Sequence, residues 1–244
     1  MPGRVSGFFR GVCHTVVNKL RKDRAAAPAG TLSPKTIPRI EPRVYGGILL
    51  NQSGLPRNAS EGEVNEDVGF ARVTGRTIIA ARGSQVNNNA LAVFSLPDKT
   101  VVAVICIGEG ATGGFAAGWV ANRACDILVE RGGRPEVFLR EINKELIGAN
   151  RARSAQGPGP SYTTTAILLL RPNGRYEMYG VGCEAYAHEA SVRGLDLTEQ
   201  QADQVLGAGP GVVVAEKKGE LPVNGYLTAG SLDSLTWVQI KRVA

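Results

Sequence analysis

The chain has 244 residues, long enough for one domain with a sizeable core, and its 43% hydrophobic and 20% charged content is that of an ordinary globular protein. No apolar run approaches the length needed to span a bilayer. Four cysteines are scattered without a C-x-x-C pair, which argues against a disulfide framework or a zinc site and fits a reducing compartment.

The net charge of +6 is concentrated at the N-terminus. Residues 1–44 hold nine basic and two acidic side chains, a net charge of +7, which leaves −1 for the rest of the chain. A localised basic segment says more about binding partners than a diffuse excess does. We therefore predict a basic arm at 1–44 and a near-neutral domain at 45–244.

Residues 4–22 have the spacing of a basic amphipathic helix, with no acidic residue before Asp23. This profile is typical of a mitochondrial targeting sequence, and it fits a partner-docking helix of the mature protein equally well. The first interpretation predicts a mitochondrial protein and the second leaves the cytoplasm open. The side chains expected to bind a partner are Phe8, Phe9, Arg10, Lys19, Arg21, Lys22 and Arg24.

Residues 25–44 contain four prolines, which cannot continue a helix or a central strand. We expect this linker to run extended over a neighbour. A basic arm of this kind suits insertion into a larger complex, where it contacts other proteins or RNA.

From Tyr45 onward the pattern changes to short strands, interrupted by two consecutive helices at 115–131 and 135–150. The order predicts an α+β fold in which both helices cover one sheet face. The expected strands are 68–73, 77–81, 90–96, 100–107, 163–170, 175–181, 226–229 and 235–243.

Six motifs follow one another along residues 45–244. They are Asn65-Glu66-Asp67, Glu109-Gly110-Ala111-Thr112-Gly113-Gly114, Ser161-Tyr162-Thr163-Thr164-Thr165-Ala166, Val181-Gly182-Cys183-Glu184-Ala185-Tyr186, Leu197-Thr198 and Gly230-Ser231-Leu232-Asp233-Ser234-Leu235-Thr236. In this order they resemble the motifs of the PPM-family (type 2C) metal-dependent protein Ser/Thr phosphatases. The resemblance implies two stacked antiparallel β-sheets flanked by helices, a four-layer α-β-β-α sandwich, here shortened.

In the family, two divalent cations between the sheets generate the hydroxide that attacks the phosphoryl group. The resemblance leaves only vestigial ligand positions in this chain. Cys183 stands where an aspartate is expected, and only 34 residues separate Thr198 from Asp233, so one ligand motif is missing. The vestigial positions are Asp67, Asp233, Glu66, Glu109 and Gly110.

We therefore expect a pseudophosphatase without catalytic residues, metal or cofactor, acting as a structural subunit of an assembly such as a mitochondrial ribonucleoprotein, for example the mitoribosome. One alternative is an active metal-dependent phosphatase with a reduced site, which would use Mg²⁺ or Mn²⁺.

A second alternative is nucleotide or dinucleotide binding at the turn from Gly108 to Gly113, which fits G-x-G-x-x-G after a buried strand. It predicts a parallel sheet and a strand, rather than a helix, at 135–147.

Overall fold

The computed structural model describes residues 37–50, 56–58, 61–78, 87–110, 112–130, 134–188, 195, 197–231 and 236–244. By its internal contacts the chain divides into two units, 1–36 and 37–244, and the described residues belong to the second. The helix predicted at 4–22 and its partner-binding side chains therefore lie outside the described residues.

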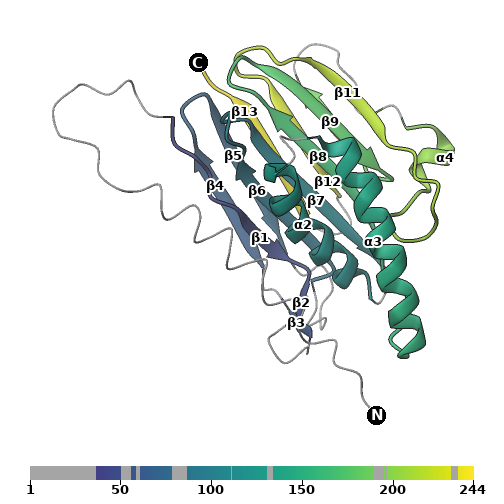
Figure 1. Cartoon of the computed structure of the whole chain (residues 1–244). Coiled ribbons are helices and arrows are strands. Elements are labelled where there is room, and N and C mark those ends of the chain that lie inside the picture. The colour runs from purple at the N-terminus through teal and green to yellow at the C-terminus, as the bar shows by residue number, and fades with distance from the viewer. Residues whose placement is uncertain are drawn as a thin grey trace. The chain divides into compact units, whose positions relative to one another are not determined.

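Two antiparallel sheets form the body of this unit (Figure 1). The six-stranded sheet has the order β1 (Arg43–Gly46), β6 (Asn89–Ser95), β7 (Val101–Glu109), β8 (Tyr162–Leu170), β9 (Arg175–Val181) and β11 (Ala215–Glu220). The five-stranded sheet has the order β10 (Ala185–His188), β12 (Tyr226–Ser231), β13 (Thr236–Arg242), β5 (Ala71–Thr77) and β4 (Gly62–Asp67). The remaining described elements are the hairpin β2 (Ile48–Leu50) and β3 (Pro56–Asn58), and the helices α2 (Gly113–Glu130), α3 (Pro135–Ala155) and α4 (Glu199–Ala202).

The six-stranded sheet is buried on both faces because its central strands are apolar at consecutive positions. On β6, Leu91 and Val93 face the core between the sheets. Ala92 and Phe94, one position out of phase, face a second core made with the helices. Continuous apolar runs of this kind are expected wherever a sheet is covered on both sides.

Helices α2 and α3 pack on the face of the six-stranded sheet that points away from the five-stranded sheet (Figure 1). Alanines let α2 lie close to the strands, and α3 buries Phe138, Ile142 and Leu146 at helical spacing. Pro135 fits the first turn of α3, where a missing N–H costs nothing. The α+β fold with stacked antiparallel sheets is confirmed, and neither long helix lies on the five-stranded sheet. Within the described residues, no helix is long and apolar enough to cross a membrane.

The prediction of a strand at 68–73 is wrong in its bounds, because strand β5 begins only at Ala71. Residues 68–70 form the hairpin turn between β4 and β5, closed by the Val68 N–H, which donates to the Ala71 carbonyl at 2.9 Å. Gly69 has a φ of +84°, a conformation that glycine adopts without strain. The apolar neighbours Val68 and Phe70 produced a strand-like pattern around it.

The domain also begins earlier than residue 45. Ile40 is buried in the core between the sheets, and its N–H donates to the Ser95 hydroxyl at 3.1 Å. Ser95 returns the contact, its N–H donating to the Ile40 carbonyl at 3.0 Å. The segment from Ile37 onward is therefore part of the folded body and not of the linker.

Candidate functional site

The candidate site lies at the end of the sandwich where β7 finishes and β6 and β13 begin. The Gly108 N–H donates to the Asn88 carbonyl at 3.2 Å, and the Asn88 side-chain amide donates to the Gly110 carbonyl at 3.2 Å. The segment that the fold brings against the glycine turn is therefore Asn87, Asn88 and Asn89, immediately before and at the start of β6.

A network of neutral polar groups lies behind this segment. The Asn87 amide donates to the Thr77 hydroxyl at 2.9 Å, and the Thr77 and Thr236 hydroxyls are 2.9 Å apart. The Asn89 amide donates to the same Thr236 hydroxyl at 3.2 Å, while the Asn89 N–H donates to the Asn87 side-chain oxygen at 3.0 Å. All four residues are at most 5% exposed, and Asn89 and Thr236 each make a further interaction, so the polar atoms of the network are engaged within the protein instead of by solvent.

Backbone closes the network on the side of β1. The Gly47 N–H donates to the Asn89 carbonyl at 2.7 Å. Gly46 has a φ of +73°, and a Cβ there would lie 2.2 Å from the same carbonyl oxygen and 2.9 Å from the Asn87 amide nitrogen. Only a glycine backbone fits this close approach.

The glycine turn after β7 is closed on itself. A Cβ on Gly108 would lie 2.3 Å from the Asn88 carbonyl oxygen and 2.4 Å from the Gly113 carbonyl carbon. The Gly113 N–H donates to the Gly110 carbonyl at 3.2 Å, and Glu109 is exposed. The turn is therefore packed against protein backbone, with its single acidic side chain facing solvent.

The N-terminus of α2 is already capped by protein groups. The Ala116 N–H donates to the Ser161 hydroxyl at 2.9 Å, and the Phe115 N–H donates to the Thr112 carbonyl at 3.1 Å. A bound pyrophosphate would need such N–H groups free. In addition, β7 pairs with antiparallel neighbours and residues 135–155 are helical. The interpretation of this turn as a dinucleotide-binding site is therefore wrong.

Two predicted acidic positions lie at the other end of the sandwich. In the β4–β5 register Gly62 is opposite Thr77, whereas Asp67 is opposite Arg72. Asp67 is five residues along β4 from Gly62, so it lies about 17 Å from the Thr77 end of the sheet. Asp67 accepts the Gly69 N–H at 2.8 Å within its own turn, and Glu66 forms an ion pair with Arg43 at 3.2 Å.

The grouping of Asp67 and Glu66 with Glu109 and Gly110 is thus corrected, because an antiparallel hairpin carries β4 away from the glycine turn before it ends. Asp67 caps a hairpin turn, as short acidic side chains commonly do. Asp233 lies outside the described residues.

The cysteines near the site are buried thiols. Cys183 lies in the core between the sheets, where burial raises the pKa of its thiol to about 12. Burial also raises the pKa of the Cys106 thiol to about 12, and the Thr165 hydroxyl contacts its sulfur at 3.6 Å. Both side chains are neutral at physiological pH, so neither offers a thiolate as a nucleophile or metal ligand.

The described residues do not fit a pair of hard cations. Mg²⁺ and Mn²⁺ take oxygen ligands, and two of them need several carboxylates to offset four positive charges. Among the described residues, no three His, Cys, Asp or Glu side chains are grouped to hold a metal ion. Apart from the exposed Glu109, the oxygen ligands that the described residues supply at this end of the fold are the amides and hydroxyls of the polar network.

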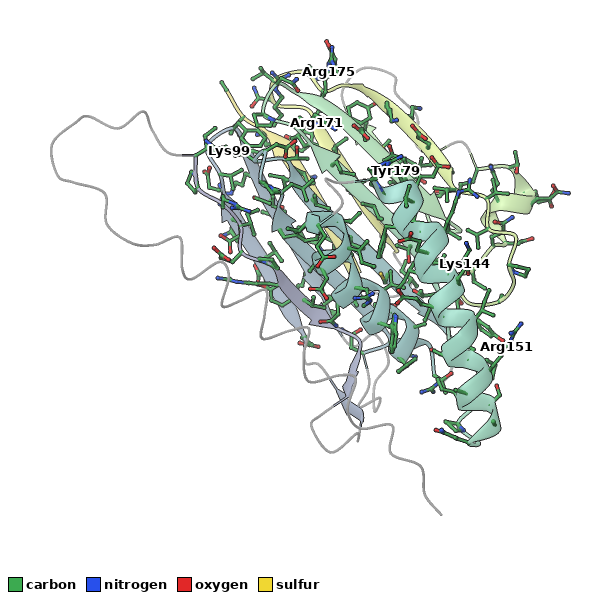
Figure 2. The ribbon with its side chains drawn as sticks, viewed as in Figure 1. Lys99, Lys144, Arg151, Arg171, Arg175 and Tyr179 are labelled. Carbon is green, nitrogen blue, oxygen red and sulfur yellow. The ribbon has the colours of Figure 1, made fainter. Side chains whose placement is uncertain are left out.

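A polar cavity of about 540 Å³ lies at the opposite end of the six-stranded sheet, lined in part by Arg171, Arg175 and Lys218. Arg171 and Arg175 are labelled in Figure 2. Arg171 is neutralised by Glu177 at 2.9 Å and by Asp98 at 3.4 Å. The same Glu177 accepts the Tyr179 hydroxyl at 2.8 Å. Burial and this carboxylate raise the pKa of Tyr179 to about 12. Two of the cations here are paired with carboxylates, Arg171 as described and Lys218 with Glu216, whereas Arg175 forms no ion pair among the described residues.

Comparison with known proteins gives the class of fold. No protein-family model matches the sequence, and no curated protein matches it. Among solved structures, a bacterial serine phosphatase matches with a TM-score of 0.57 and 14% identity, over 75% of this chain and 100% of that chain. The serine/threonine phosphatase Stp1 of Staphylococcus aureus matches with a TM-score of 0.54 and 13% identity, over 77% of this chain and 98% of that chain.

RsbX, solved in complex with magnesium, matches with a TM-score of 0.54 and 10% identity, over 73% of this chain and 98% of that chain. The described domain therefore has the fold of the PPM-type serine/threonine phosphatases. At this level of identity the likeness shows the fold and leaves the activity open.

None of the predicted site residues includes Asn87, Asn88 or Asn89, although their sequence carries a signal. Three consecutive asparagines immediately precede a buried strand, and the next strand ends in the glycine turn. Antiparallel pairing of two such strands places the start of the first beside the end of the second. A search for acidic residues passes over this segment because its side chains are amides.

The network predicts a pH-dependent cost for a charge at Asn89. Asn89→Asp should lower the free energy of unfolding at pH 7 by about 1–3 kcal/mol, because a buried carboxylate would replace a neutral donor. Burial raises the folded-state pKa of this carboxyl above its unfolded value of about 3.9. The loss of stability should therefore be complete at neutral pH, and it should shrink as the pH falls toward about 4. Urea unfolding of variant and wild type at several pH values measures it.

Asn173→Asp is the matched control for this experiment. Asn173 is exposed in a hairpin turn, where its side-chain oxygen accepts the Arg175 N–H at 3.0 Å, and an aspartate keeps that acceptor. It should change stability little at any pH. A loss at Asn89→Asp that is independent of pH would show that the carboxylate charge does not cause it, and a loss that Mn²⁺ reverses would show a cation pocket instead of a neutral network.

Proposed function

We propose that this chain is a catalytically inactive protein with the PPM phosphatase fold, and that it serves as a structural or scaffolding subunit of a larger assembly. The observation that supports inactivity is the polar network of Asn87, Asn89, Thr77 and Thr236 at the end of the sandwich that holds the glycine turn. Its side chains are neutral and hydrogen-bond to one another.

The physical argument rests on charge. Metal-assisted phosphoryl transfer needs cations that lower the pKa of a bound water and neutralise the developing negative charge. Amides and hydroxyls do not offset the charge of two such cations, and these are already engaged as donors and acceptors. Without the metals a phosphatase forfeits most of a rate enhancement that reaches ~10²¹-fold for phosphate monoesters.

Inactivity predicts that the purified full-length chain, with Mn²⁺ or Mg²⁺, hydrolyses neither a phosphopeptide nor an aryl phosphate above background. A bacterial PPM phosphatase assayed in parallel is the positive control. Asp67→Asn is the matched control variant, because Asp67 lies at the far end of β4. Metal-dependent turnover that Asp233→Asn abolishes and Asp67→Asn leaves intact would show that a reduced site is active, and the proposal of inactivity would fail.

The assembly role is proposed from the distribution of charge. Residues 1–36, which precede the folded body, hold seven basic and one acidic side chain, a net charge of +6, whereas residues 37–244 are neutral overall. A helix of the length predicted at 4–22 is marginal alone in water, so its apolar stripe needs a partner groove, an import receptor or a membrane. We infer attachment through this arm to other proteins of a complex or to RNA, in a mitochondrial ribonucleoprotein such as the mitoribosome.

Deleting residues 1–36 and supplying a generic mitochondrial targeting signal separates import from assembly. The deletion ends at residue 36 because Ile37 and Ile40 belong to the core of the body. We expect the truncated body to reach the same compartment and to co-purify with its complex at a much lower level than the full chain. Co-purification at the full-length level would mean that the arm serves only for import and not for attachment to the complex.

Two double variants distinguish the kind of neighbour. If the arm docks on protein, Phe8→Ala with Phe9→Ala should weaken co-purification more than Arg21→Ala with Lys22→Ala, because buried aromatics dominate protein interfaces. If the neighbour is RNA, the order should reverse and binding should fall steeply with salt.

A further inference from the structure

After the polar network, a second feature distinguishes the folded body. It is the face of the five-stranded sheet that points away from the core. We call it the outer sheet face and define it by Arg72, Arg76, Tyr186, Tyr226, Trp237 and Lys241, which alternate with core residues on β5, β10, β12 and β13. The two long helices pack on the other sheet. Trp237 is 43% exposed and Tyr186 is 39% exposed, both unusually open for large aromatic side chains.

The strand register arranges these side chains in rows across the sheet. In one row Trp237 lies directly opposite Arg76. In the last row Lys241 lies between Arg72 and Tyr226. Each exposed aromatic at the ends of β12 and β13 thus has a cation as its cross-strand neighbour. The Lys241 ammonium is 5.4 Å from the centre of the Tyr226 ring.

The row between them is uncharged and polar. Gln239 lies between Thr74 and Thr228, and Tyr186 is opposite Thr228 on the next strand. Amide and hydroxyl groups of this kind donate and accept hydrogen bonds without a fixed charge. The surface therefore alternates bands of aromatic and cationic side chains with one band of neutral donors and acceptors.

The cations of the outer sheet face are not held in ion pairs. Within the described part of the chain, Arg72, Arg76 and Lys241 take part in no ion pair. Arg72 donates to the neutral Asn65 side-chain oxygen at 3.2 Å. Acidic side chains also lie on this face. On the edge strand β4, Glu63 is directly opposite Arg76 and Asp67 is directly opposite Arg72, and Glu184, just before β10, accepts the Tyr186 hydroxyl. Among the described residues, neither Glu63 nor Asp67 forms an ion pair with these arginines.

We propose that the outer sheet face binds single-stranded RNA. Single strands are held by aromatic rings on which bases stack and by cations that follow the phosphates, and sheets with exposed aromatics serve as such platforms. The neutral band supplies donors and acceptors for base edges and for the 2′-hydroxyl that distinguishes RNA. A protein partner fits this face less well, because the centres of protein interfaces are depleted of charge. On this face, each row that crosses β13 combines aromatic or amide groups with cations or hydroxyls.

This inference does not rest on the proposed loss of phosphatase activity, since the surface lies outside the core in which the site is built. It also differs from RNA binding by the N-terminal arm. The test must therefore report on the sheet face itself, and Trp237 provides the probe because the chain contains only one other tryptophan, Trp119.

The experiment uses the full-length chain with Trp119→Phe, so that emission comes from Trp237 alone. Titration with an oligouridine of roughly ten nucleotides should quench Trp237 saturably, because a base stacks on the indole. Adding Arg76→Glu should weaken the binding read at Trp237 by about tenfold or more, by setting a carboxylate beside the stacked base. Lys144→Glu is the matched control, an exposed cation on α3 (Figure 2), and should have little effect.

Fluorescence anisotropy of labelled RNA with otherwise wild-type protein gives a second readout that does not need the Trp119 substitution. Trp237→Ser should weaken binding by about tenfold, whereas Trp237→Phe should retain most of it, because phenylalanine keeps a stacking surface.

Four results would overturn the proposal. RNA binding without any change in Trp237 emission would assign the RNA to the arm or another surface. Equal losses with Arg76→Glu and Lys144→Glu would indicate diffuse attraction. Equal quenching by a polyglutamate peptide would indicate a protein-binding face, and equal affinity for the matching oligodeoxyuridine would remove the role of the 2′-hydroxyl.

Discussion

The hydrogen bond between the hydroxyls of Thr77 and Thr236 organises the end of the sandwich on which the functional interpretation depends. The two threonines belong to adjacent strands of the five-stranded sheet, and their partners Asn87 and Asn89 lie before and at the start of β6 in the other sheet. The network therefore joins the two sheets through neutral groups. Gly46 and Gly108 let the surrounding backbone approach the asparagine segment closely.

Neutrality is what allows this end to be closed. A buried carboxylate without a counter-charge is costly, so a sandwich that holds carboxylates there needs the cations that they bind. Asparagine has nearly the shape of aspartate and lacks its charge, and it can satisfy its neighbours without a metal. The same fold can therefore be stable without a metal, with the two sheets held by hydrogen bonds that need no ion.

The order of elements could be predicted from the sequence because it depends on local pattern. The apolar run at 101–107, the Pro-Asn-Gly turn after Leu170 and the helical spacing after Pro135 each identify an element from adjacent residues. Strand β11 could not be found in this way, since its sequence Ala-Glu-Lys-Lys-Gly-Glu at a sheet edge has little apolar content.

The composition of the site could not be predicted because it depends on register between distant segments. Asp67 is acidic and precedes a strand, yet the β4–β5 hairpin directs it to the far end of the sheet. Asn89 is placed beside Ile107 only by the pairing of β6 with β7. Residue type alone favours the motif Asn65-Glu66-Asp67 over the three asparagines at 87–89. The topology, however, brings the asparagines to the glycine turn.

Direct measurement of Mn²⁺ binding tests the central claim, that this end of the fold is a neutral network and not a binuclear metal centre. Free Mn²⁺ can be followed by electron paramagnetic resonance while the full-length chain is titrated with the metal. The account predicts that Mn²⁺ stays free at concentrations comparable to the protein, and that Asp233→Asn and Glu109→Gln leave the titration unchanged. Stoichiometric uptake of about two ions per chain, lost in either variant, would contradict it.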